Sequence, residues 1–458
     1  MSFGTGDGNM GKEGLDGRLR SAVRAGDAEA VRHLLDRGAD PDAVDANGLP
    51  VLCVAVAAYD DAVAEALVEG GADPDRVLPD GTTPLWRAVD GGSPAVFSAV
   101  LGKEPRLRLA KPARERLLAL ARSWYETGTA EELRRRTGTP VSAATARVRD
   151  GEYDWIDQVS VGGLVARAGH GAILTSLEWA FRVLTPVDEL IARAVEHRDE
   201  EHVDWSTVCW ILSRRRSFET WSAVVAHRHD PDRVNRWFVA DYLWRREIFD
   251  TGSSYEKEES EFLAAWAAEE TDGQMLAKVL DIFTGHDHPD HEAIFLRYAS
   301  HPDPRVRREV PYALWMDHGP RSPAARAALL TLMSDPDAEV RLRACTLSMR
   351  DRGLLQETTR ALLPLGEAPD ARVRGAAAGA LAVSPDRTPV VANALVALLD
   401  DDDQLVRLEA AYGLALRDDP HTGEAIERVG PLGDGFKDDH RAAHLWSWRW
   451  RKEHPGNE

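Results

Sequence analysis

The sequence predicts an all-α fold, an α-solenoid built from two kinds of helical repeat. Sequence motifs recur at a step of 33 residues near the N-terminus, and at steps of 33 or 34 residues in the C-terminal third. Periods of this length are typical of proteins in which each repeat is one small helical unit stacked on the next. Between the motifs, apolar residues follow helical spacing. Only the Gly-rich apolar runs of residues 150–179 are compatible with a short β-hairpin.

The first period occupies residues 17–102, after a Gly-rich stretch at 1–16 that we expect to be a flexible tail. The pentapeptide GADPD occurs twice, and the motif NGLPVLCVA aligns with DGTTPLWRA one period later. Pro84 has the preset φ that suits the first turn of a helix. The TTPLW run and the GAD elements resemble the ankyrin repeat, which implies helix pairs joined by projecting fingers with turn dipeptides at their tips.

A connector is expected at residues 103–184, followed by a second helical array at 185–440. In the C-terminal third a Val-Arg pair recurs four times, with an Asp three residues before each valine. The Asp can cap a helix, and the valine begins an apolar stripe at helical spacing. The repeated element resembles the HEAT-like repeat of the phycobilin-lyase type. The four valines are Val306, Val340, Val373 and Val406.

The chain ends in a stretch, 441–458, that we expect to form a capping helix and tail. A cap needs an apolar inner side over the last repeat and a charged outer side. Steps of four residues place Ala442, Trp446 and Trp450 on one face, which is therefore the expected inner side.

Composition restricts the class of partner. The net charge is −20, which disfavours general binding to nucleic acid or to anionic membranes. No run of 18 apolar residues or secretory signal is present, and three scattered cysteines fit a reducing compartment, so a cytoplasmic protein is expected. Arginine outnumbers lysine 49 to 7, which suggests a GC-rich bacterial genome.

The ankyrin resemblance implies protein–protein recognition through exposed residues at the finger tips and on adjacent helical turns. We therefore expect a non-catalytic interaction scaffold that needs no cofactor and favours basic protein partners. Its oligomeric state is left open. The expected partner-binding residues are Asp45, Asn47, Leu49, Tyr59, Leu78, Asp80, Thr82 and Arg87.

The stretch GHDHPDH at 285–291 contains His286, His288 and His291, which have the chemistry of metal ligands. In register with the repeats, however, it falls at a turn between two helices. Asp287 or His288 can cap the second helix and Pro289 can begin it. The turn is the favoured interpretation, and a metal site is the minor alternative.

An enzyme is the alternative to a scaffold. Glu152, Asp154 and His170 lie near glycines in the connector and could perform acid–base chemistry if they met in space. Some HEAT-like proteins are DNA glycosylases for alkylated bases, so a glycosylase or a lyase-type enzyme remains the second candidate. Six tryptophans of the second helical array could stack bases in such an enzyme, although core packing is their usual role. The tryptophans are Trp205, Trp210, Trp221, Trp237, Trp244 and Trp266.

Overall fold

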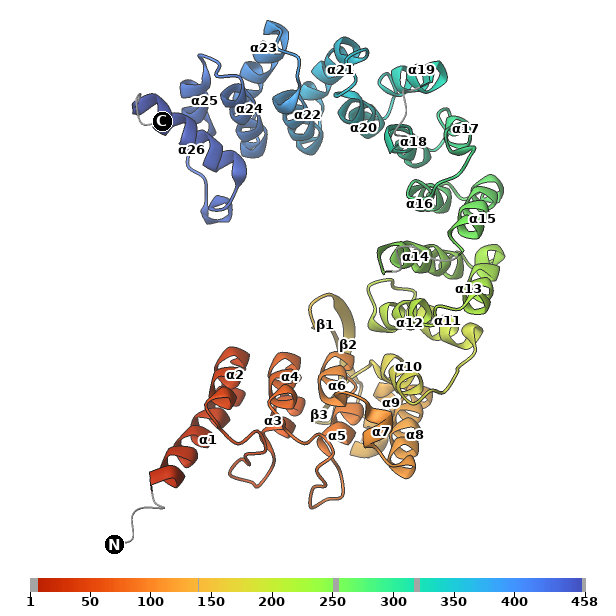
Figure 1. Ribbon diagram of the computed structural model, residues 1–458, viewed down its shortest axis with the longest axis vertical. Coiled ribbons are helices and arrows are strands. Elements are labelled where there is room, and N and C mark those ends of the chain that lie inside the picture. The colour runs from red at the N-terminus through yellow and green to blue at the C-terminus, as the bar shows by residue number, and fades with distance from the viewer. Residues whose placement is uncertain (1–6, 139, 250–254, 317–321, 455–458) are drawn as a thin grey trace. The chain divides into compact units, whose positions relative to one another are not determined.

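The computed structural model describes residues 7–138, 140–249, 255–316 and 322–454 (Figure 1). It contains two compact units, residues 1–251 and 252–458, called here the N-terminal and C-terminal units. Both are built mainly from short antiparallel helices, so the expected all-α repeat fold is confirmed.

The N-terminal unit begins with three helix pairs. Their bounds are α1 (Asp7–Ala25), α2 (Ala28–Asp36), α3 (Val51–Ala58), α4 (Asp61–Glu69), α5 (Pro84–Gly91) and α6 (Pro94–Leu101). The first helices of the pairs pack in one row, α1 on α3 on α5, and the second helices pack in another, α2 on α4 on α6. Two long loops, the first finger (43–50) and the second finger (76–83), project on the same side of this block (Figure 1). Thr83 caps α5 through the amide of Trp86, and Pro84 is its first residue, as expected.

The connector holds a small sheet. Its helices are α7 (Pro105–Arg108), α8 (Lys111–Thr127), α9 (Thr129–Thr137) and α10 (His170–Ala180), and its strands are β1 (Ala144–Asp150), β2 (Asp154–Val161) and β3 (Leu164–Arg167). The strands are antiparallel in the order β1-β2-β3, so the expected hairpin is the β2–β3 pair of a three-stranded sheet. Helix α9 packs on β2 and β3, and β3 contacts α5 of the ankyrin block.

The N-terminal unit continues with α11 (Val187–Val195), α12 (Val203–Arg214), α13 (Phe218–Val225) and α14 (Arg233–Phe249). Helix α10 packs on α12 and α12 on α14, so the helical stacking continues beyond the sheet. Of the tryptophans in the two arrays, Trp205, Trp221 and Trp266 are buried as expected, whereas Trp210 and Trp244 are exposed.

The C-terminal unit is a stack of helix pairs in two layers (Figure 1). One layer contains α16 (Gly273–Phe283), α18 (Pro304–Met316), α20 (Ala338–Ser348), α22 (Ala371–Val383), α24 (Gln404–Leu416) and α26 (His440–Glu453). The other contains α15 (Glu256–Glu269), α17 (His291–Leu296), α19 (Pro323–Leu332), α21 (Leu355–Leu362), α23 (Pro389–Ala397) and α25 (Thr422–Val429).

The repeated Val-Arg pair has a structural role at both positions. The four valines are buried, as are the residues four positions later. The arginine after each valine donates from Nη1 to two backbone carbonyls just before the helix, as Arg374 does to Ala368 and Pro369 at 3.0 and 3.1 Å. Arg374 also holds the Asp401 carboxylate of the next repeat at 2.6 and 2.8 Å. The motif therefore buries an apolar stripe and ties the preceding turn to the helix.

Both ends of the chain differ from the expectation. Residues 1–6 of the expected tail lie outside the described residues, but 7–16 belong to α1, because Leu15 packs on the ankyrin core and Asp16 accepts from the amide of Asp40 at 2.8 Å. The expected inner face of α26 is wrong. Leu445 is buried, whereas Trp446 is 68% exposed.

Polar contacts determine which side of α26 faces the preceding repeat. Arg441 bonds to Glu409 on the neighbouring helix at 2.6 Å, and the indole of Trp448 donates to Asp418 at 2.8 Å. These bonds turn the side of α26 that carries Leu445 inward. The four-residue spacing of Ala442, Trp446 and Trp450 therefore predicts the wrong inner face.

Candidate functional site

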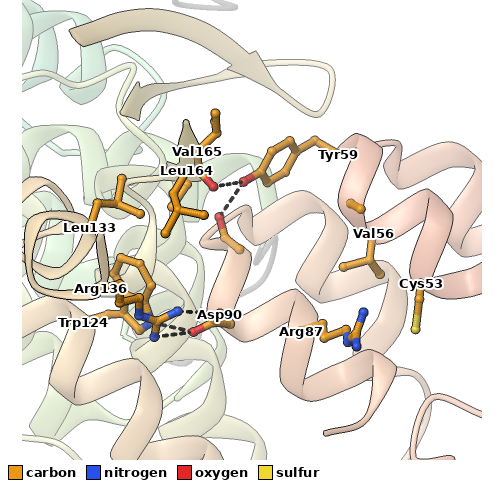
Figure 2. Close-up of a pocket in the computed structure, with 13 residues that line it drawn as sticks. Cys53, Val56, Tyr59, Arg87, Asp90, Trp124, Leu133, Arg136, Leu164 and Val165 are labelled. Atoms are coloured by element: carbon orange, nitrogen blue, oxygen red, sulfur yellow. Dashed lines mark hydrogen bonds and ion pairs between the residues drawn. The ribbon is translucent and has the colours of Figure 1, made fainter. Parts of the chain in front are cut away.

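The ankyrin block and the connector enclose a cavity of about 300 Å³ within the N-terminal unit. Helices α3 and α5 form one wall, and α8, α9 and β3 form the other (Figure 2). Its apolar lining includes Val56 and Leu133, and the strand residues Leu164 and Val165 stand at its edge with 43% and 45% of their surface exposed.

A polar network around Asp90 lies at one end of the cavity (Figure 2). Both carboxylate oxygens of Asp90 accept from the Arg136 guanidinium at 2.8 Å, and one of them also accepts from the indole of Trp124 at 2.9 Å. The guanidinium stacks 4.4 Å from the Trp124 ring and also bonds to Glu132 at 2.8 Å. The hydrogen bonds that Arg136 donates to Asp90 raise the pKa of Arg136 above its ordinary value. The network therefore fixes α9 against α5.

Tyr59 joins the ankyrin block to the sheet. It follows α3 in the left-handed conformation with φ 57°. Its hydroxyl lies between the carbonyls of Gly91 and Val165, at 3.2 and 3.3 Å, and Arg167 stacks over its ring. Burial raises the pKa of this phenol. Tyr59, expected at a binding surface, therefore lies at the cavity and is also a structural contact with β3.

The first finger is shaped by Asp45. Its carboxylate accepts from the amides of Asn47 and Leu49 at 2.8 and 2.9 Å, which lowers the pKa of Asp45, with the Leu49 bond as the first cause. Asn47 is exposed and Leu49 is half-buried. The finger thus has a fixed conformation with Asn47 at its exposed tip.

In the second finger, Asp80, Thr82 and Arg87 bond to one another. Asp80 accepts from the Thr82 hydroxyl at 2.6 Å and from Arg87 at 2.8 Å, and Arg87 also donates to the Thr82 hydroxyl at 3.1 Å. These bonds, above all that from Thr82, lower the pKa of Asp80 to about 2. Arg87 also lines the cavity, so the second finger continues into the cavity wall (Figure 2).

The expected exposure of Leu78 is wrong. Leu78 is 5% exposed, while its neighbour Val77 is 74% exposed. The amide of Leu78 donates to the carbonyl of Thr82 at 2.8 Å, which closes the finger and directs the Leu78 side chain inward. Sequence reasoning also missed Trp124, Asp90 and Arg136, because each belongs to a helical pattern that gives no sign of a site.

The cysteine beside the cavity is not activated. Burial raises the pKa of the Cys53 thiol to about 11 and that of Cys345 to about 12, and it also raises the pKa of the buried Cys209. We expect the native protein at pH 8 to show no rapid reaction with a thiol reagent, because the thiolate is the reactive form. In denaturant, all three thiols should react. Fast labelling of native Cys53, measured by mass spectrometry of peptides, would contradict this picture.

The histidine-rich turn in the C-terminal unit directs its side chains to separate partners. His286 is buried with Nδ1 3.1 Å from the carbonyl of Ile282 and Nε2 3.4 Å from Glu259. His288 lies 3.5 Å from Glu261, and His291 packs on Phe283 and Phe295. The helix after the turn begins two residues later than expected, with Asp290 as its N-cap and His291 as its first residue. The reason is that Nδ1 of His288 accepts from the amide of Asp290 at 3.1 Å, which prolongs the turn past Pro289.

The connector residues singled out for acid–base chemistry have different surroundings. Glu152 is exposed, and Asp154, whose pKa is raised by burial, interacts with Ser206. His170 stacks on Trp124 at 4.5 Å, and burial lowers its pKa to about 4, so the ring is neutral at pH 7.

Across the described part of the chain, no helix is long and apolar enough to cross a membrane.

The comparisons with known proteins identify the two repeat types. Residues 19–108 match ankyrin repeats in three copies, and residues 260–350 and 326–415 match HEAT repeats. No curated protein matches the chain. One similar solved structure is the X-ray structure of YibA of Escherichia coli, which is 16% identical with a TM-score of 0.42, and the match covers 59% of this chain and 93% of that chain. The two family models show that the chain combines an N-terminal block of ankyrin repeats with HEAT repeats in its C-terminal region.

Proposed function

We propose that this protein is an interaction scaffold, and that the surface formed by the second finger, the cavity and β3 binds a segment of a partner protein. Ankyrin and HEAT repeats suggest such a role in general. The observation that carries the specific proposal is the exposure of adjacent apolar side chains, Leu164 and Val165, at the edge of a cavity. Exposed apolar groups beside a concave surface are typical of binding sites.

The chemistry of the cavity supports binding rather than a reaction. The Asp90 carboxylate accepts three hydrogen bonds, so it is poorly placed to take a proton from a substrate. The Cys53 thiol has its pKa raised to about 11 and is a weak nucleophile near neutral pH. The hydrogen bonds of Asp90 instead suit a binding site. They hold the cavity wall rigid, and a rigid surface loses little conformational entropy when a partner docks.

The charge of the chain favours a basic partner. With a net charge of −20, the field around the protein attracts cationic proteins and increases their rate of association. The apolar contacts at β3 would then supply the short-range part of the binding energy.

The test compares two matched pairs of exposed apolar neighbours. Leu164→Ser with Val165→Ser removes the apolar edge of the cavity, and Val183→Ser with Leu184→Ser changes another exposed apolar pair, between α10 and α11. We expect partners captured by the wild type to bind the first variant at least about thirtyfold more weakly, as for the loss of a binding hot spot of ~2 kcal/mol. The control variant should bind normally. Equal capture by the wild type and the β3 variant would reject this surface.

A further inference from the structure

A second, smaller cavity of about 170 Å³ lies on the other side of Trp124 within the N-terminal unit. Its walls come from α8, α9, β1, β2, α10, the end of α11 and the start of α12. Three carboxylates, those of Asp157, Glu196 and Asp204, line it together with His197, and its lining contains no lysine or arginine. Such a lining attracts a small cation.

Ligand-type atoms converge at one side of this cavity. Nε2 of His197 lies 3.5 Å from Oδ2 of Asp204, and Nδ1 of His202 lies 3.7 Å from the same oxygen. Ligands bound at 2.0–2.1 Å to a tetrahedral zinc ion are separated by about 3.3 Å. Over the residues that the structure describes, this is the one group of three such side chains whose ligand atoms lie within 4.8 Å of one another.

The buried carboxylate at this place is incompletely bonded. Asp204 is 1% exposed, and its Oδ1 accepts no hydrogen bond. Buried carboxylate oxygens are normally paired or coordinate a metal, because desolvation of a charge is costly. Gly171 allows the carboxylate to lie here, since a Cβ at that position would stand 2.8 Å from both Asp204 oxygens. The fold thus holds an incompletely bonded carboxylate, with Oδ2 beside two imidazoles and Oδ1 without a hydrogen-bond partner.

We propose that His197, His202 and Asp204 bind a divalent transition-metal ion, for which zinc is the simplest probe. Two imidazoles and one carboxylate are a ligand set that suits zinc, iron(II) or cobalt(II). The remaining coordination positions would face the cavity, where water or a small anionic group could occupy them. This proposal is independent of the partner-binding surface at β3.

Binding requires two local changes, and the second gives a measurable signature. The two imidazole rings are stacked 3.8 Å apart and 23° from parallel, so His197 must turn for both lone pairs to point at one ion. Its side chain is 35% exposed, which leaves room for this rotation. Without the ion, Nδ1 of His202 accepts a hydrogen bond from the amide of Asp204 at 3.2 Å. Coordination of the ion by Nδ1 would replace that hydrogen bond. The amide of Asp204 should therefore exchange faster with solvent when the ion is bound.

The experiment measures zinc binding to the full chain by equilibrium dialysis with metal analysis. The variants are His197→Ala at the exposed rim and His202→Asn, which removes the imidazole but keeps a residue type that caps helices well. His288→Ala, in the C-terminal unit, is the control for the other histidine cluster. Circular dichroism confirms that each variant is folded.

We expect the wild type and His288→Ala to bind one equivalent of zinc at this site, and His197→Ala and His202→Asn to bind it at least about tenfold more weakly. Zinc should also accelerate hydrogen exchange at the amide of Asp204 in the wild type and in His288→Ala, but not in the two site variants. The proposal is overturned if the wild type binds no zinc. It is equally overturned if the two site variants match the wild type, or if only His288→Ala loses the ion.

Discussion

Gly92→Ala is expected to lower the free energy of unfolding of the N-terminal unit by about 3 kcal/mol or more. Gly92 has φ +77°, and a Cβ there would stand 1.9 Å from the carbonyl oxygen of Arg167 and 2.5 Å from Cε1 of His170. The clash is with backbone, so a side-chain rotation cannot relieve it. The carbonyl of Gly92 also accepts from the amide of Gly169 at 3.0 Å, so the strands and α10 would have to move.

Gly128→Ala is the matched control. Gly128 has φ +80° but no heavy atom within 4 Å of the added Cβ, so its cost is the conformational strain alone, about 1 kcal/mol. Chemical denaturation of the two variants gives the difference. Equal losses would mean that the ankyrin block and the β3–α10 segment do not approach closely in solution.

Arg193→Met is expected to cost about 3–5 kcal/mol, because it leaves the buried Glu178 carboxylate without its main counter-charge. Arg193 is 2% exposed and donates to Glu178 at 2.7 Å and to the Thr175 hydroxyl at 3.1 Å. Arg122 also contacts Glu178 at 3.0 Å but is half exposed, so it compensates poorly. Adding Glu178→Leu should restore most of the lost stability, since an apolar pair of similar size is tolerated at such sites.

The pH dependence gives a second readout for this pair. In the wild type, burial acts to raise the pKa of Glu178, but the hydrogen bonds from Arg193 and Thr185 and the charge of Arg193 outweigh it, so this pKa is lowered. Its contribution to stability is therefore present above the unfolded pKa, about 4.3, and is lost as the pH falls through the folded pKa. In Arg193→Met, burial favours the protonated acid instead. The difference in unfolding free energy between the two proteins should thus shrink from pH 7.5 to pH 4.5. An unchanged difference would contradict the buried ion pair.

Local sequence signals predicted much of the fold. Val340 and Val373 are buried where the repeat phase places them, and Asp337 caps α20 through the amide of Val340 at 3.0 Å. These features depend on neighbours within one or two turns of helix, so a recurring pattern reveals them. The role of the arginine after each valine was not predicted, because its acceptors are backbone carbonyls, which have no sequence signature.

The candidate site was predicted only in part. Asp45, Asp80 and Thr82 were recognisable because a finger is a local structure with turn residues. Tyr59 and Arg87 were also named, but the cavity that they line was not predicted, because it depends on contacts between distant segments, such as Tyr59 with Val165 and Asp90 with Arg136. The side-chain direction of Leu78 was missed for a related reason. Which side chains of a short loop face inward depends on the backbone hydrogen bonds of the loop. A shift of one residue is enough to exchange the exposed Val77 with the buried Leu78.

The most direct test of the proposed binding surface is site-specific photocrosslinking in the full chain. A photoreactive amino acid is introduced at Val77, at Leu164 or, as a control, at Leu184, which is as exposed as Val77. We expect Val77 and Leu164 to give adducts with the same partner protein, and Leu184 to give none. Adducts from Leu184 with that partner, and none from Val77 or Leu164, would contradict it.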